Sequence, residues 1–401
     1  MQERIKLLCI CNDLAMGGIQ KLLVTTASVL NRDFFDITVC SIGSDVTLAK
    51  ELEDLGVKII ALGRRCKIYN ILIAGDLFDI IRTTKPHIVH THSFYSNFHG
   101  RLAAFFLGVP CIVASEHGTY SSRKGLRHRL LDLCLSAVSD RVIAVSRAVK
   151  NFLVQEEHIP EKKISVIYNT LDFTKMVSRD RAVARKEFQW EASAVLLGHV
   201  GTYTPTKGQD IAIEVMNRIV RDIPQACLIL VGADPVRYRK VLSERVRELG
   251  LTGKVQFFDR VDDMTLFLSA LDLFLFPSAT EGFGLAVLEA AAMGVPVVAY
   301  ATEGIQEIFE DTRGVYLVSE RSPEAISHAT KTVIYNIEQA RVDALLVKEH
   351  VREKFAPGIF AGQLEKLYTD ILTAKGVAVL PKESVSRSEP ALTQTFTRKP
   401  S

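Results

Sequence analysis

Short apolar runs alternate with longer segments of helical periodicity along the first half of the chain. The runs are rich in Ile and Val and lack polar alternation, which is typical of parallel strands covered on both faces. They lie at 5–11, 36–42, 57–62, 87–92, 110–115 and 141–146. Helical patterns separate them near 18–31, 46–55, 70–84, 95–107 and 126–138. This repeated strand–helix order predicts a doubly wound, Rossmann-like sheet over residues 1–175.

A second set of the same kind follows a polar stretch at 172–193. Its predicted strands lie at 194–200, 226–232, 254–258, 272–277 and 296–300, with helices near 207–220, 235–249, 283–293 and 322–346. We therefore expect an α/β protein with a second Rossmann-like domain at 190–355, the two parallel-sheet domains facing each other across a cleft. A last helix is predicted at 357–374, and residues 376–401, rich in Ser, Thr and Pro, are predicted to be disordered.

Composition narrows the class of protein. The 401 residues are 48% hydrophobic with a net charge of +3, which suits large buried cores and implies no strong attraction to nucleic acid. Cys9 and Cys11 form C-x-C inside an apolar run, a spacing that disfavours a zinc or redox site and favours buried thiols in a reducing cytoplasm. No apolar stretch reaches the roughly 18–20 residues of a membrane span, and the start lacks a signal-peptide pattern. We expect a soluble cytoplasmic protein, or one that sits at the inner face of the membrane.

Ligands of open α/β sheets bind at the carboxyl ends of the strands, so we expect the functional residues in the segments that follow the strands. The strand at 272–277 is followed by a polar loop and the segment EGFGLAVLE at 281–289. Gly282 and Gly284 would let backbone amides approach a ligand at a helix start, where the helix dipole favours anions. Glu281 and Glu289 could accept hydrogen bonds from hydroxyls at two ends of that ligand. Taken alone, Glu281 is better explained as a loop residue that caps the helix and Glu289 as part of a surface ion pair. The whole constellation instead favours ligand binding.

The E-x7-E pattern enclosing G-F-G, followed by E-A-A-A-x-G-x-P-V-V, resembles glycosyltransferase family 4, whose members have the GT-B fold. Further short motifs of the family occur in the same order: M-G-G-I-Q at 16–20, E-H-G at 116–118, V-S-R-A-V at 145–149, V-I-Y-N-T-L-D at 166–172 and V-G-T-Y-T-P-T-K-G at 200–208. The resemblance covers about residues 4–375. It implies that the last helix crosses back to the first domain.

The resemblance also implies roles for the segment 281–289. Glu281 would bond hydroxyls of the donor sugar, and Glu289 would bond the ribose of the nucleotide. After Gly282, the amides of Phe283, Gly284 and Leu285 would face the sugar and the diphosphate.

Other positions that match the family complete the expected site. Lys207 would neutralise the diphosphate, and Gly17 and Gly18 would let the first loop approach the phosphates or the acceptor. His117 matches a histidine that lies beside the anomeric carbon in the family.

One departure from the family concerns the phosphate site. The family commonly has Arg directly after the glycine that corresponds to Gly201, and this chain has Thr202 there. Half of the usual cationic clamp is therefore missing, and Arg260, near another strand end, is a candidate substitute. A second departure is Glu303-Gly304, where the family often has Gly-Gly.

The resemblance implies a retaining transfer of a hexosyl unit from a nucleotide-diphosphate sugar to a hydroxyl, without a metal or other cofactor. The donor should bind mainly to 195–350 and a carbohydrate or lipid-linked acceptor mainly to 1–170, in bacterial cell-surface polysaccharide or glycolipid synthesis. The alternative is a catalytically silent nucleotide-sugar-binding protein, which Thr202 favours. Hydrolase, NTPase and dehydrogenase functions are disfavoured because their G-x-S-x-G, P-loop and G-x-G-x-x-G motifs are absent.

Two further groups of residues have open interpretations. His90 and His92 share one strand face and could be packed side chains, acceptor contacts or, less favoured, metal ligands. The basic residues before an apolar helical pattern could hold an anionic membrane surface or could be a solvated helix face. These residues are Arg123, Lys124, Arg127, His128 and Arg129.

Overall fold

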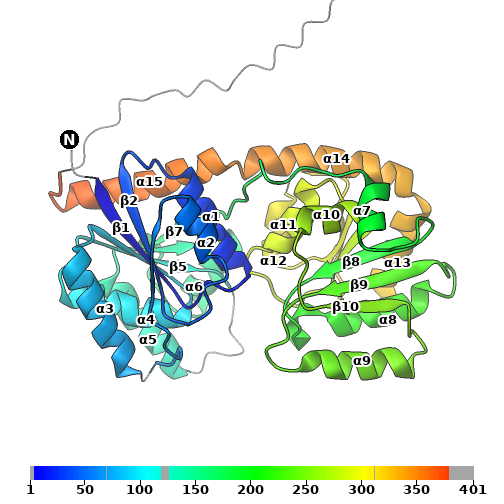
Figure 1. The fold of residues 1–401 in the computed structure, drawn as a ribbon, viewed down its shortest axis with the longest axis horizontal. Helices are drawn as coiled ribbons and strands as arrows, with labels where there is room; N and C mark the ends of the chain where they lie inside the picture. Colours follow the sequence, from blue (N-terminus) through cyan, green and yellow to red (C-terminus); the bar gives the residue numbers. More distant parts are fainter. Residues whose placement is uncertain (1–3, 69, 119–125, 311, 379–401) are drawn as a thin grey trace, which may run out of the picture.

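Two parallel sheets lie side by side, and two long C-terminal helices run along one side of both (Figure 1). The computed structural model describes residues 4–68, 70–118, 126–310 and 312–378, with the side chains of 126–128 also left undescribed. Most of the segment predicted to be disordered, 376–401, therefore lies outside the described residues.

The first sheet has seven strands in the order β3-β2-β1-β4-β5-β6-β7, all paired in parallel. The strands are β1 Ile5–Cys11, β2 Phe35–Ser41, β3 Lys58–Ala61, β4 Ile88–His92, β5 Cys111–Glu116, β6 Arg141–Ala144 and β7 Ile164–Val166. The helices of this half are α1 Gly18–Val29, α2 Ala49–Asp54, α3 Ile71–Thr84, α4 Phe94–Phe106, α5 Leu126–Val138 and α6 Arg147–Gln155. The strand order reverses beside β1, whose neighbours are β2 and β4.

The second sheet repeats this plan with six parallel strands in the order β10-β9-β8-β11-β12-β13. The strands are β8 Val195–Val200, β9 Ala226–Val231, β10 Val255–Phe258, β11 Leu273–Phe276, β12 Val297–Tyr300 and β13 Tyr316–Val318. The helices are α7 Arg181–Glu187, α8 Gln209–Ile219, α9 Tyr238–Glu248, α10 Met264–Ala270, α11 Leu285–Ala292, α12 Glu303–Ile308, α13 Pro323–Tyr335, α14 Ile337–Lys354 and α15 Pro357–Ala374. The order reverses between β8 and β11, which are neighbours. The prediction of two doubly wound parallel-sheet domains is confirmed.

Several element boundaries were wrong in the sequence prediction. The single helix expected at 322–346 is two helices, α13 and α14, because the chain leaves helical geometry at Asn336 (φ −115°, ψ 34°). The edge strands β7 and β13 were not predicted, since each has only three residues and carries too short a pattern. The short helices α6, α7, α10 and α12 were also not predicted.

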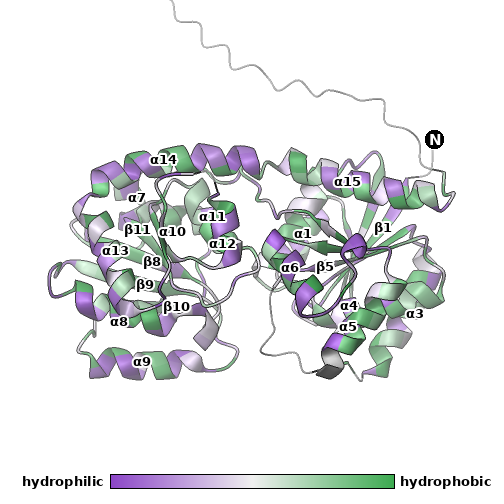
Figure 2. Ribbon diagram, turned by 180° about the vertical axis from the view of Figure 1, so that it is seen from behind, coloured by the Kyte–Doolittle hydropathy of each residue, from purple (hydrophilic) through white to green (hydrophobic). Residues whose placement is uncertain are grey.

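Apolar cores cover both sheets, and one of them continues across the domain boundary from Val142 and Leu153 to Phe283 and Leu288. The last two helices also join the two halves. Helix α15 packs Leu364, Tyr368 and Leu372 into the core of the first sheet. Helix α14 packs Val347 and Val351 into the core that includes α11. Hydrophobic residues accordingly line the sheets, whereas outward helices such as α9 are largely hydrophilic (Figure 2).

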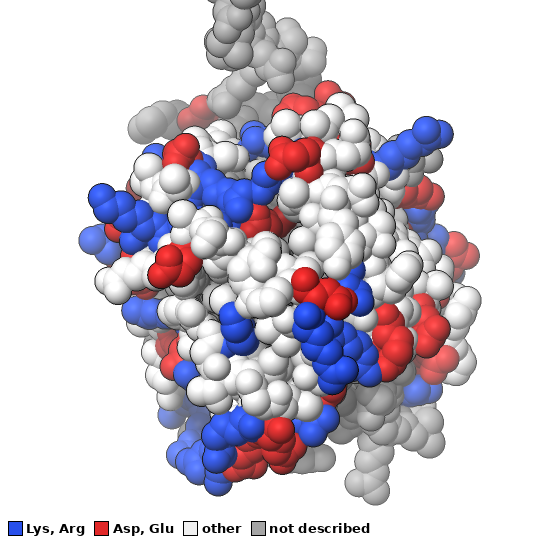
Figure 3. All heavy atoms as spheres, turned by 90° about the vertical axis from the view of Figure 1, so that its right-hand side faces the viewer, with Lys and Arg blue, Asp and Glu red and all other residues white. Residues whose placement is uncertain are grey.

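Charged side chains of both signs are mixed on the end of the second domain (Figure 3). Ion pairs of the second domain include Arg245 with Glu214 and Arg239 with Asp259. This face offers no extended field of one sign, in agreement with the small net charge.

Candidate functional site

Lys207 and Glu281 meet where the strand order of the second sheet reverses. Lys207 ends the 3₁₀ turn Pro205–Lys207 after β8, and Glu281 lies in the loop after β11. Lys207 Nζ is 2.7 Å from Glu281 Oε1, with the side chains 30% and 9% exposed. In open α/β sheets this reversal point is where ligands bind. The structure therefore brings a cation and a carboxylate together at the expected place for an anionic, hydroxyl-bearing ligand.

Backbone contacts hold the two loops that carry this pair. The amide of Ala279 donates to Thr206 O at 2.7 Å, and Ser278 Oγ donates to the same oxygen at 3.2 Å. Gly208, at φ +76°, ends the turn, and a Cβ there would lie 2.3 Å from Pro277 O. Hydrogen bonds between the loops that follow β8 and β11 therefore hold Lys207 and Glu281 in position.

Three glycines allow the segments around Glu281 to approach one another. A Cβ on Gly282 would lie 2.3 Å from His117 O, and one on Gly304 would lie 2.5 Å from Glu281 O. Gly284 precedes α11 at φ +93°, a left-handed conformation that glycine adopts without strain. The departure at Glu303 therefore leaves the required glycine, Gly304, in place.

The first domain closes the other side of the site with the start of α1. A Cβ on Gly18 would lie 3.1 Å from Leu285 Cδ1, so the loop of Gly17 and Gly18 reaches the N-terminus of α11. Lys21 Nζ lies 3.4 Å from Glu289 Oε1 across the domain boundary. Lys21 was missed from the sequence, although its place one turn into α1, after the two glycines, is a usable signal.

Phe283 does not face the site with its side chain. The ring is 2% exposed and packs against Tyr168 and Phe355, with centroid distances of 6.0 and 5.3 Å. Its side chain thus anchors the loop, and any role in binding belongs to its backbone. Like Gly284 and Leu285, it lies at the N-terminus of α11, where amides lack intrahelical acceptors.

Thr202, which stands where the family commonly has Arg, lies on the side of the site where the phosphates are expected. Thr202 is exposed just after β8, and its carbonyl and that of Gly201 each accept from Gln209 Nε2 at 3.0 Å. Arg260, proposed from the sequence as a substitute cation, is 67% exposed and lies 3.5 Å from Asp262. The role of Arg260 as a substitute for the missing Arg stays a prediction.

His117 follows β5 and lies beside the donor loop through its backbone contact with Gly282. Burial lowers the pKa of His117 to about 4, so the ring is neutral near pH 7. His117 Nε2 faces His92 Nδ1 at 3.4 Å. His90 and His92 are each 2% exposed, which favours their interpretation as packed side chains. Within the described residues, no group of three or more His, Cys, Asp or Glu side chains could hold a metal ion.

Glu307 follows the Glu303-Gly304 departure where the family pattern expects it, but sequence reasoning did not predict that it connects the two domains. Its carboxylate accepts from the amides of Arg147 and Ala148 at 2.8 and 2.5 Å, at the N-terminus of α6 in the first domain. The phenol of Tyr168 donates to it at 3.0 Å, and burial raises the pKa of that phenol to about 12. Ser146 Oγ adds a bond to Gly282 O at 2.5 Å. The second domain thus caps a helix of the first, and this fixes the distance between the two halves of the site.

Replacing Glu307 by alanine is expected to lower the free energy of unfolding by about 2 kcal/mol, because three donors lose a charged acceptor. Urea denaturation measures this loss. Glu303→Ala on the same helix is the matched control, since Glu303 is exposed, and it should change stability by less than about 0.5 kcal/mol. Equal stability of the two variants would contradict the proposed helix cap.

Three buried histidines predict a loss of stability in mild acid. Burial lowers the pKa of His90 to about 3, that of His199 to about 4, and that of His92 well below its usual value. In the unfolded chain each imidazole takes up a proton near pH 6.5. Below that pH the unfolded state binds more protons, so the free energy of unfolding should fall by about 1 kcal/mol per histidine between pH 7.5 and 5.5. Urea denaturation at both pH values tests this, and stability that stays constant would contradict it.

The basic segment proposed for membrane contact is only partly described. Arg123 and Lys124 lie outside the described residues, as do the side chains of Arg127 and His128. Arg129 is 31% exposed and pairs with Glu156 at 3.2 Å. No helix in the described residues is long and apolar enough to cross a membrane.

Comparisons with known proteins agree with this architecture. The model for Glycosyltransferase Family 4 matches residues 16–175, and the model for Glycosyl transferases group 1 matches residues 194–336. The chain is 28% identical to N-acetyl-alpha-D-glucosaminyl L-malate synthase of Bacillus anthracis, over 76% of this chain and 80% of that protein. It is 26% identical to UDP-Gal:alpha-D-GlcNAc-diphosphoundecaprenol alpha-1,3-galactosyltransferase of Escherichia coli, over 71% and 76% of the two chains.

Solved structures share the two-domain fold. The crystal structure of Anabaena Alr3699/HepE in complex with UDP and glucose superposes with a TM-score of 0.82 at 21% identity, over 91% of this chain and 100% of that one. Sucrose-phosphate synthase from Thermosynechococcus elongatus gives a TM-score of 0.79 at 19% identity, over 92% and 100%. With both domains matched by family models and the two-domain fold shared over 91% of the chain, the chain belongs to the family 4 glycosyltransferases and has the GT-B fold.

Proposed function

We propose that this glycosyltransferase moves a hexosyl unit from a nucleotide-diphosphate sugar to a hydroxyl acceptor, with retention of configuration at the anomeric carbon. The observation that carries the proposal is the pair Lys207–Glu281, 2.7 Å apart at the strand-order reversal. When a donor binds, its diphosphate would replace Glu281 as the ion-pair partner of Lys207. Glu281 would then be released to accept hydrogen bonds from the sugar hydroxyls.

The remaining residues have proposed roles in the same complex. The amides at Phe283, Gly284 and Leu285 would bind the sugar and diphosphate oxygens, because the start of a helix favours anions. Glu289 would exchange its contact with Lys21 for the ribose hydroxyls.

Retention is proposed to follow from attack of the acceptor hydroxyl on the face from which the diphosphate leaves. An oxygen of the leaving phosphate takes the acceptor proton, the new glycosidic bond forms, and the bond to the diphosphate breaks. Lys207 and the α11 amides stabilise the charge that develops on the leaving group. His117 is neutral and lies beside the reacting carbon in this arrangement.

A thermal-shift screen against UDP-, GDP- and ADP-sugars tests donor binding. The true donor should raise the melting temperature strongly, because a ligand at about 100 times its Kd stabilises the folded state by about 2.7 kcal/mol. The relatives named above suggest UDP-sugars as the first donors to test. An absence of any shift across the panel would count against the donor site.

We further propose that no metal takes part, since Lys207 and backbone amides supply the positive charge at the leaving group. Transfer activity in EDTA should stay within about twofold of the untreated rate, because the developing charge is already met by protein groups. Mg²⁺-supplemented enzyme is the control. Loss of activity on chelation, restored by metal, would contradict this step.

The acceptor is proposed to be a carbohydrate or a lipid-linked sugar of bacterial glycoconjugate synthesis, bound mainly by the first domain. The names of the two relatives support this class, and one of them acts on a diphosphoundecaprenol-linked acceptor. Arg123, Lys124, Arg127 and Arg129 are proposed to face an anionic membrane surface or lipid diphosphate.

A catalytically silent nucleotide-sugar-binding protein is the second candidate, and the exposed Thr202 in place of Arg favours it. The two candidates differ in turnover. Only the enzyme releases a nucleoside diphosphate when donor and acceptor are both present.

A further inference from the structure

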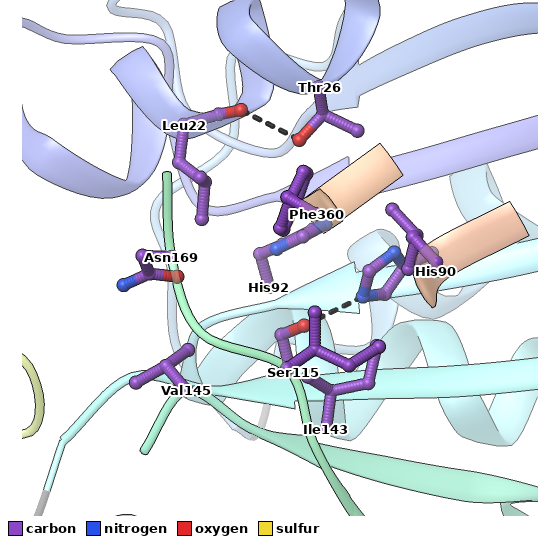
Figure 4. Close-up of a pocket in the computed structure, with 11 residues that line it drawn as sticks. Leu22, Thr26, His90, His92, Ser115, Ile143, Val145, Asn169 and Phe360 are labelled. Atoms are coloured by element: carbon purple, nitrogen blue, oxygen red, sulfur yellow. Dashed lines mark hydrogen bonds between the residues drawn. The ribbon is translucent and has the colours of Figure 1, made fainter. Parts of the chain in front are cut away.

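Three histidines stand in a row at the carboxyl edge of the first sheet. His90 and His92 end β4 with their ring centroids 4.0 Å apart, and His117 follows β5 with its ring 5.6 Å from that of His92. Figure 4 shows His90 and His92 near the start of α15, with Phe360 beside them. The row runs from the C-terminal helix to the loop that touches Gly282, so it connects a buried core to the donor side of the site.

His90 is bonded at both ring nitrogens. Nδ1 lies 2.6 Å from the hydroxyl of Tyr368 on α15, and Nε2 lies 2.8 Å from Ser115 Oγ. The ring therefore has a fixed orientation and no nitrogen left for a metal. His92 packs against this fixed ring.

His92 has one bonded nitrogen and one buried nitrogen. Nδ1 faces His117 Nε2 at 3.4 Å, whereas Nε2 is buried with no hydrogen-bond partner among the described residues. The adjoining cavity, of about 10 Å³, is at the lower limit for one water. Two of its polar groups are already used, since Thr26 donates to Leu22 and Ser115 bonds His90 (Figure 4). Asn169 also lines the cavity, so it is the small volume that argues against an ordered water beside His92 Nε2.

The facing nitrogens of His92 and His117 can share only one proton when both rings are neutral. If His117 Nε2–H donated, His92 would carry an N–H on Nε2, buried without an acceptor. If His92 Nδ1–H donates, Nε2 is instead a bare acceptor. Buried N–H groups without a partner are the rarer case in proteins, so the geometry favours the second arrangement.

We propose that His92 is a positioning residue that donates its Nδ1–H to His117 Nε2 and holds His117 as the Nδ1–H tautomer. This proposal rests on the proposed function, in which His117 lies beside the anomeric carbon. It makes Nδ1–H of His117 a hydrogen-bond donor toward the substrate and excludes Nε2 as a general base. The present 3.4 Å separation is long, and such contacts commonly tighten when a substrate binds.

Two substitutions at His92 distinguish the loss of its hydrogen bond to His117 from the loss of side-chain packing. His92→Leu removes the donor, whereas the amide nitrogen of His92→Asn stands close to the place of Nδ1 and keeps it. We expect kcat to fall about 10–100-fold in His92→Leu with KM within about threefold, and to recover to within about fivefold of wild type in His92→Asn. His87→Leu, at the opposite end of β4, also loses one hydrogen bond, to the amide of Lys6, and should leave kcat unchanged. Wild-type kcat in His92→Leu, or equal losses in the Leu and Asn variants, would overturn the proposal.

Nuclear magnetic resonance of the full chain labelled with ¹⁵N-histidine tests the tautomer without any activity. His117, assigned by the signal that disappears in His117→Gln, should show a protonated Nδ1 and a bare Nε2 in wild type, and mixed tautomers in His92→Leu. A protonated Nε2 in wild type would refute the inference. Absence of transfer with every donor would instead refute the proposed function, and it leaves this spectroscopic result standing.

Discussion

Replacing Lys207 by alanine should lower kcat for sugar transfer by about 10²–10³-fold, the largest single effect expected in this protein. The ammonium group is the charge held at the strand-order reversal, and Thr202 leaves it without the Arg that the family commonly has beside it. No other cation in the described residues forms an ion pair with Glu281. Steady-state kinetics with the donor identified by thermal shift measures the loss.

Lys331→Ala is the matched control for this substitution. Lys331 is 29% exposed and lies 3.0 Å from Asp222, whereas Lys207 is 30% exposed and lies 2.7 Å from Glu281. Both variants lose one partly exposed ion pair, worth about 0–1 kcal/mol in stability, so their melting temperatures should be similar. If Lys207→Ala kept the rate of Lys331→Ala, the proposed role in stabilising the leaving group would be wrong.

Replacing Gly282 by alanine should lower kcat/KM by about 100-fold, because the two halves of the site would be forced apart. The new Cβ would lie 2.3 Å from His117 O, and backbone atoms cannot rotate away as a side chain can. Ser146 and Glu307 hold the domains together at the same boundary, so the strain would fall on the loops of His117 and Glu281.

Gly75→Ala provides the control for adding a methyl group. Gly75 lies within α3, and nothing stands within 4 Å of the Cβ that would be added. Alanine is favoured over glycine in a helix by about 1 kcal/mol, so this variant should keep full activity and gain stability. Full activity in Gly282→Ala would show that the domains do not need this close contact.

The fold could be predicted from the sequence because buried parallel strands leave a strong pattern. Runs such as 5–11 and 226–232 are apolar on both faces, and the structure has β1 and β9 there. Boundaries failed where local geometry decides them. Asn336 turns out of helical geometry between α13 and α14 within a continuous helical pattern, and β13 is a three-residue edge strand.

The candidate site could be predicted only in part, since a motif describes residues close in sequence. Lys207 and Glu281 stand 74 positions apart, and the resemblance placed both in one site, where the structure brings them into contact. The contacts across the domain boundary carried no such signal. Glu307 caps α6 from 159 positions away, and Lys21 reaches Glu289 across 268. Such pairs depend on how the domains face each other, which a one-dimensional pattern does not encode.

Release of nucleoside diphosphate from the stabilising donor is the most direct test of the central claim. The purified chain should release it from at least one UDP-, GDP- or ADP-sugar in the presence of a hydroxyl acceptor. Glu281→Ala should slow that release markedly while its melting temperature without ligand stays close to wild type. A donor that raises the melting temperature but is never turned over, or turnover that survives Glu281→Ala unchanged, would contradict the account.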